Sequence, residues 1–173
     1  MDEAWPPFRM SAAALGHARL ESPTPVGWTF KAMLAHVAAW HRSAARRLRA
    51  FRETGQTGTP DPAGADALYE ELGLGAAHRE ALGRGWDMDR FNAAVAEAAA
   101  SRAPADVLRD LDASFTLVRD EAGRLSDAEV AADVQDGRSW AVALVAGDTY
   151  EHYEEHRAEL AASRPKTAEV EGA

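Results

Sequence analysis

Two histidines four residues apart, His152 and His156, have the spacing in this chain that most directly indicates chemistry. In an α-helix, side chains four positions apart lie on one face, so the two imidazoles would point the same way. A helical pair of this kind can share one metal ion. Two imidazoles cannot fill a coordination sphere, and the best candidate for a third ligand is His36. The competing interpretation is that these are ordinary half-buried histidines.

Three neutral imidazoles and a water would suit Zn²⁺ or Ni²⁺, with Fe²⁺ and Mn²⁺ as further choices, and would leave one coordination position open. An open position favours catalysis over a purely structural ion. A water bound there could become the nucleophile, or a thiolate could take its place. The chain has no cysteine. A reacting thiol would therefore come from a low-molecular-weight cofactor, and no residue of the chain is assigned as the catalytic group.

Asp148 precedes His152 by one helical turn. It could orient an imidazole through a hydrogen bond, act as a fourth ligand, or face solvent, and the first and third roles are favoured. His41 is five residues from His36, so on one helix their side chains point about 140° apart and only one of them can join the site. We expect His41 to pack in the core with a hydrogen bond.

The segments that must position these side chains are all predicted to be helical. Alanine is abundant and alternating β-branched stretches are rare, which is typical of an all-α protein. Helices are expected at about residues 8–20, 29–51, 87–125 (divided at Pro104) and 139–161. Polar ligands flanked by aliphatic residues on one helical face indicate a site inside a helix bundle.

The remaining segments are predicted from composition. Residues 55–85, between the second and third helical regions, are expected to form a loop with short helices, which either covers a site or crosses the end of the bundle. His78 falls in this segment and receives no role. Residues 1–162 are expected to form one domain, and the polar tail 163–173 is predicted to be disordered.

The formal net charge of −9 disfavours nucleic-acid partners and anionic membrane surfaces. No apolar stretch approaches the roughly 20 residues that span a bilayer, and the N-terminus lacks the features of a signal peptide, so a cytoplasmic location is expected. Five arginines crowd residues 42–52; they are predicted to form a solvated face rather than an anion-binding patch: Arg42, Arg46, Arg47, Arg49 and Arg52.

Residues 28–40, WTFKAMLAHVAAW, and residues 147–156, GDTYEHYEEH, together resemble the DinB/YfiT-like superfamily of bacterial four-helix-bundle proteins. The second segment is most similar to the branch of ClbS/DfsB-type proteins. The resemblance implies a divalent metal bound by one histidine of the second helix and a histidine pair of the last. These positions correspond to His36, His152 and His156. It also implies a homodimer.

The superfamily includes mycothiol-dependent maleylpyruvate isomerases and bacillithiol S-transferases, and other members are linked to DNA damage or toxin resistance. The resemblance therefore implies a metal- and thiol-dependent transferase that acts on small electrophilic or toxic molecules during stress. The alternatives are a metal-dependent hydrolase or isomerase, and a non-catalytic protein that sequesters a small ligand.

Overall fold

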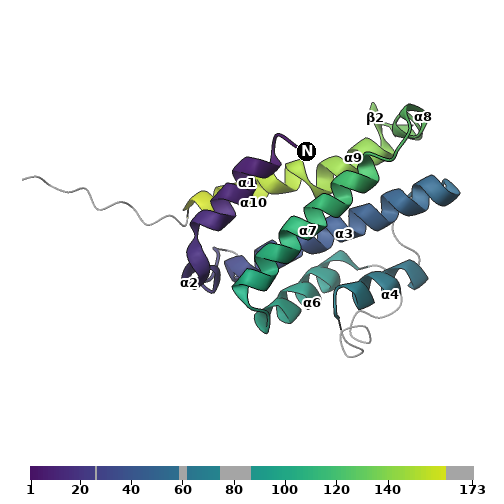
Figure 1. Cartoon of the computed structure of the whole chain (residues 1–173). Helices are drawn as coiled ribbons and strands as arrows, with labels where there is room; N and C mark the ends of the chain where they lie inside the picture. The colour runs from purple at the N-terminus through teal and green to yellow at the C-terminus, as the bar shows by residue number, and fades with distance from the viewer. Residues whose placement is uncertain (26, 59–61, 75–86, 163–173) are drawn as a thin grey trace, which may run out of the picture.

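The computed structural model describes residues 1–25, 27–58, 62–74 and 87–162 (Figure 1). This part of the chain is all-α, as the sequence predicts, apart from a two-stranded antiparallel hairpin that was not predicted. None of its helices is long and apolar enough to cross a membrane. His78 and the tail 163–173 lie outside the described residues. The elements are α1 (Trp5–Ala14), α2 (Gly16–Leu20), α3 (Phe30–Thr54), α4 (Pro62–Glu71), α6 (Met88–Ala100), α7 (Pro104–Ala122), α8 (Asp127–Val130), β1 (Val134–Gln135), β2 (Arg138–Ser139), α9 (Trp140–Asp148) and α10 (Tyr150–Ala162).

The long helix α3 is the centre of the arrangement. It packs along α7 and against α6 and α9, while α10 packs mainly on α1 and α9 (Figure 1). Every residue from Phe30 to Ala39 is buried. The first half of α3 is therefore surrounded by other elements, and a polar side chain there must find its partners inside the protein.

Local side-chain signals fix the starts of several helices where the sequence predicts them. The hydroxyl of Thr29 accepts a hydrogen bond from the Ala32 backbone N–H at the start of α3. Asp87 caps α6 in the same way, and Ser139 caps α9. Pro104 opens α7, where the missing N–H costs nothing. These caps satisfy donors that the first turn of a helix leaves unpaired.

The last helix differs from the prediction. We expected one helix over about 139–161, but α9 ends at Asp148 and α10 begins at Tyr150. Thr149 lies between them with φ −132° and ψ −96°, and its hydroxyl donates to the carbonyl of Val145. Gly147 and Thr149 are both weak helix formers, and a threonine hydroxyl that bonds a preceding carbonyl can bend a helix. The continuous helical face that was predicted to run from Ala141 to Leu160 is therefore interrupted.

The first predicted helix is also divided, into α1 and α2. The division falls at Gly16, whose φ of +69° is readily adopted only by glycine. The short helix expected near residues 66–72 is present as α4. In the hairpin, Asp136 and Gly137 have φ of +52° and +79°, as a tight two-residue turn between antiparallel strands requires.

The arginines of α3 lie on a partly exposed face, as predicted, with 49% of the Arg49 side chain and 37% of the Arg46 side chain exposed, and they also form ion pairs that were not predicted. Arg42 lies 3.1 Å from Glu71 of α4 and also contacts Asp110 of α7. Arg49 lies 2.8 Å from Glu121, whose side chain is fully buried. The ion pairs of these arginines join α3 to α4, α7 and α9.

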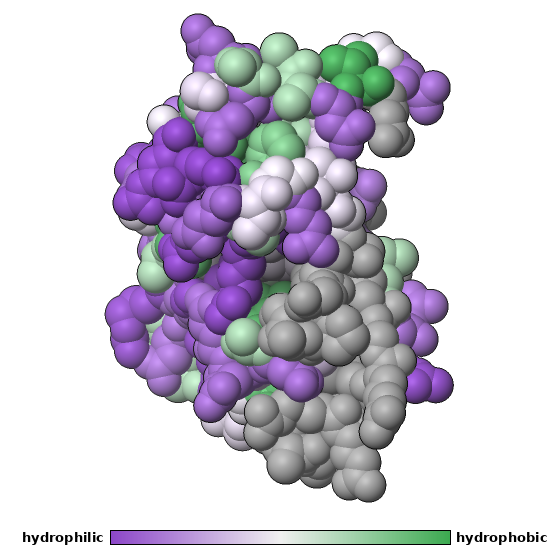
Figure 2. Space-filling view, turned by 90° about the vertical axis from the view of Figure 1, so that its right-hand side faces the viewer, coloured by the Kyte–Doolittle hydropathy of each residue, from purple (hydrophilic) through white to green (hydrophobic). Residues whose placement is uncertain are grey.

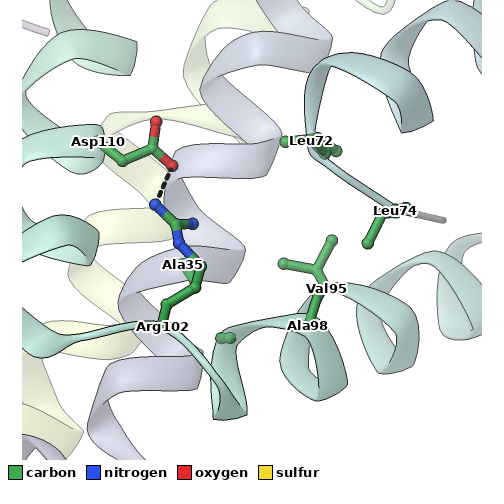
Figure 3. A pocket seen from close by; sticks show the side chains of 8 residues that line it. Ala35, Leu72, Leu74, Val95, Ala98, Arg102 and Asp110 are labelled. Atoms are coloured by element: carbon green, nitrogen blue, oxygen red, sulfur yellow. Dashed lines mark hydrogen bonds and ion pairs between the residues drawn. The ribbon is translucent and has the colours of Figure 1, made fainter.

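An apolar area of the surface and a small cavity between helices both lie away from the predicted site. Polar residues cover most of the described surface in Figure 2, and apolar residues gather at the top, the end that carries α8 and the hairpin. A small cavity of about 20 Å³ lies beside Ala35, between α3, α6 and α7 (Figure 3). Its wall includes the Arg102–Asp110 ion pair of 3.1 Å, and its volume is just enough for one water. None of the three predicted ligands lines it.

Candidate metal centre

The structure brings His36, His152 and His156 together. His36 lies in the buried half of α3, and the other two lie in the first two turns of α10. The Nε2 atoms of His36 and His152 are 2.9 Å apart, and those of His156 and His152 are 3.0 Å apart. One ring nitrogen from each residue lies within 4.8 Å of the other two. These three histidines could therefore hold one metal ion.

Two of the distances between the ring nitrogens, 2.9 and 3.0 Å, lie in the range that a shared ion needs, and the third is no longer than 4.8 Å. Metal–nitrogen bonds of about 2.0–2.1 Å, at angles between a right angle and the tetrahedral angle, place two nitrogens about 2.9–3.4 Å apart. Without an ion the arrangement is awkward, because a neutral imidazole has one donor and one acceptor. The Nε2 atom of His152 faces two other ring nitrogens at once, and hydrogen bonding satisfies such a cluster poorly.

Burial keeps the three imidazoles neutral, which is the form that binds metal. Burial, together with the charge of a protonated His156, lowers the pKa of His36 to about 3. The same desolvation, with the neighbouring histidines, lowers the pKa of His152 to about 2. The pKa of His156 is also lowered by burial, although Glu159 and Glu155 act in the opposite direction. At neutral pH all three therefore offer lone pairs rather than positive charge.

Aromatic rings enclose His36. The ring of Trp28 lies 5.2 Å from its imidazole, and that of Trp40 lies 6.2 Å away, both edge to face. The indole N–H of Trp40 donates to Asn92 of α6 at 3.1 Å, and Asn92 raises the pKa of His36 against the effect of burial. The sequence analysis did not assign Trp28 or Asn92 to the site. No spacing signal connects them to it, because they reach it only through tertiary packing.

Glu159 is another residue of the site that was not predicted. Its Oε1 atom lies 3.7 Å from Nδ1 of His156, and its Oε2 atom and that Nδ1 are both buried without a hydrogen-bond partner. Carboxylates commonly orient the imidazoles of metal sites from this side. Its position one turn after His156 could have identified it.

Asp148 is not brought to the three imidazoles. Its carboxylate lies 3.8 Å from the Arg47 guanidinium of α3, with only 13% of the side chain exposed. Burial raises the pKa of Asp148 to about 7, although the charge of Arg47 acts to lower it. The interruption at Thr149 separates this residue from the face of α10 that carries His152.

His41 lies in the core with hydrogen bonds, as predicted. It is fully buried, and its Nδ1 atom lies 3.0 Å from the Ser114 hydroxyl. Its Nε2 atom lies 2.7 Å from the hydroxyl of Tyr153. It therefore takes no part in the three-histidine cluster.

The sequence model of the DinB superfamily matches residues 2–160, so the chain belongs to that superfamily. No curated protein and no solved structure matches the chain. The match covers both segments that carry the candidate ligands.

Proposed function

We propose that this member of the DinB superfamily binds one divalent metal ion through His36, His152 and His156 and uses it to catalyse a reaction of a small molecule. The convergence of three neutral, buried ring nitrogens is the observation that carries the proposal. Three nitrogen ligands suit Zn²⁺ or Ni²⁺ best, followed by Fe²⁺ and Mn²⁺. With three protein ligands, a position remains for a water, a thiolate or a substrate atom.

The reaction class that the resemblance to thiol-dependent members of the superfamily favours is transfer of an external thiol to an electrophile. A metal ion bound at the site would supply Lewis acidity, which keeps a thiol deprotonated at neutral pH. The chain has no thiol of its own, so the sulfur must come from a small cofactor. The sulfur would form a bond to an electrophilic carbon while the leaving group departs. The residues of the chain contribute burial, which strengthens electrostatic interactions, and the apolar walls of Trp28 and Trp40.

Two other outcomes are distinguished by experiment. Activation of water at the same open position would make the protein a hydrolase or an isomerase. Metal binding without turnover would make it a protein that sequesters a small toxic ligand. The resemblance to the superfamily also implies detoxification during stress and assembly as a homodimer, and both are part of the proposal.

The first test is elemental analysis of protein purified without a histidine tag. We expect about one equivalent of metal in the parent protein and little in His36→Ala or His152→Ala. His17→Ala is a matched control, because His17 is exposed on α2, and it should keep the metal. Circular dichroism should show that all variants keep their helices.

Protein that contains no metal and takes up none when it is added would refute the proposal. A loaded protein should next be assayed with low-molecular-weight thiols and model electrophiles. Consumption of thiol that stops in His152→Ala would support transfer. Hydrolysis or isomerisation without thiol would replace transfer as the reaction class.

A further inference from the structure

A directed chain of buried hydrogen bonds runs beside the histidine cluster. The Ser114 hydroxyl donates to the carbonyl of Leu111 at 2.9 Å, so its oxygen is left to accept from Nδ1–H of His41 at 3.0 Å. With the proton on Nδ1, the Nε2 atom of His41 must be an acceptor. It accepts from the hydroxyl of Tyr153 at 2.7 Å. Each polar group in the chain is thus satisfied, and the imidazole tautomer is determined.

This series of hydrogen bonds connects three helices beside the candidate metal centre. Tyr153 is the neighbour of His152 on α10, and His41 follows His36 by five residues on α3, while Ser114 belongs to α7. Since α10 packs mainly on α1 and α9, it makes few contacts with α3. The bond between Tyr153 and His41 joins α10 to α3, as does the close approach of His152 to His36.

The interruption at Thr149 increases the importance of that bond. If α9 and α10 formed one continuous helix, the orientation of α9 about its axis would also fix that of α10. The irregular dihedral angles of Thr149 interrupt the helix and remove this constraint. The rotation of α10 about its own axis must then be set by tertiary contacts. A rotation about the axis moves His152 and Tyr153 together, because they are adjacent on one rigid helix.

Aromatic packing holds the ring of Tyr153 in place. Phe8 of α1 stacks on it with the ring centres 4.8 Å apart, and Trp5 lies 5.7 Å away. Trp5 is stacked in turn on Phe115 at 4.1 Å. The phenol ring is fully buried, so its hydroxyl contacts His41 in one orientation.

We propose that Tyr153 is a positioning residue for the metal site: its hydrogen bond to His41 fixes the rotation of α10 relative to α3, and so brings His152 and His156 into register with His36. The inference rests on the proposed function, because it assumes that the three histidines bind a metal. It adds that the site depends on a residue that is not a ligand. Tyr153→Phe keeps the packed ring and removes only the bond that fixes the rotation.

The test compares zinc affinity with stability in two variants. Tyr153→Phe should weaken zinc binding at least about tenfold, measured by competition with a chromophoric chelator, because loss of a group that orients ligands typically costs this much. Val118→Ala is the matched control. Val118 is fully buried in a separate core cluster with Leu48 and Leu144, so its truncation should lower stability without changing zinc affinity.

The histidine side chains of the metal-free protein give an independent readout. Long-range ¹H–¹⁵N NMR spectra should show His41 protonated at Nδ1 and shifted signals of His36 and His152 in Tyr153→Phe. Unchanged zinc affinity in Tyr153→Phe, or an equal loss in Val118→Ala, would overturn the inference. If the parent protein takes up no metal, the proposed function fails and the NMR comparison alone decides whether Tyr153 sets the register. If Tyr153→Phe does not fold, His41→Leu removes the acceptor of the same hydrogen bond from α3, with the same expectation.

Discussion

Replacement of the buried Asp148 by asparagine should stabilise the protein at high pH. The carboxylate is 13% exposed, and its Oδ2 atom is buried without a hydrogen-bond partner. Its nearest ionic partner, Arg47, lies 3.8 Å away, and burial lowers the pKa of Arg47 as well. For both side chains, the free energy lost on leaving water therefore exceeds the free energy gained from the attraction between their charges.

The pKa gives the size and sign of the effect. A pKa raised from 3.8 to about 7 in the folded protein corresponds to about 4 kcal/mol. The folded state binds the proton more tightly, so this stabilising contribution is complete below pH 4 and is lost as the pH rises through 7. Asparagine has the shape of the protonated acid. Because Arg47 then lacks its charged partner, we expect a net gain in the free energy of unfolding of about 2 kcal/mol at pH 8, which falls towards pH 6.

Urea unfolding followed by circular dichroism at pH 6, 7 and 8, in the presence of a chelator, measures this difference. The histidines affect parent and variant alike, so they cancel in the comparison. Asp120→Asn is the control, because Asp120 is half exposed and its replacement should change stability little at any pH. An Asp148→Asn variant that is less stable than the parent at pH 8, or a difference that does not depend on pH, would refute the reasoning.

Three further substitutions test other buried polar groups. Glu159→Gln should weaken metal binding about tenfold, because a carboxylate no longer orients His156; unchanged affinity in a chelator competition would argue against that role. Glu121→Ala should cost about 3 kcal/mol in urea unfolding at pH 7, since it leaves three guanidiniums without their shared, buried carboxylate. Lys31→Met should cost about 2 kcal/mol in thermal unfolding, because the ammonium of Lys31 donates to two backbone carbonyls at the end of α6; a variant as stable as the parent would contradict this.

The sequence predicted the parts of the fold that depend on local chemistry. The caps at Thr29 and Asp87 and the proline that opens α7 lie within a few residues of the helix ends they define. The pairing of His152 with His156 is likewise a local property of one helix. The proximity of His36 could not come from periodicity, because no pattern within α3 or α10 states that they are neighbours. That contact was anticipated only from the resemblance to a family.

The features that were missed depend on tertiary structure or on small energy differences. Gly147 and Thr149 each lower helix propensity only slightly, so their combined effect at the end of α9 was not apparent. Asp148 was placed near the histidines by assuming an unbroken helix, and the interruption instead leaves it beside Arg47. Asn92 reaches His36 from α6, which no spacing within either segment could reveal.

The positions of the three histidines along the chain have a consequence for handling the protein. His36 and His152 are 116 residues apart in sequence, so an ion shared by them would act as a reversible cross-link that closes a long loop of the chain. Closure of a loop this long greatly reduces the entropy of the unfolded chain. Metal loading would then protect the whole fold against proteases, and a chelator would remove that protection without breaking any covalent bond.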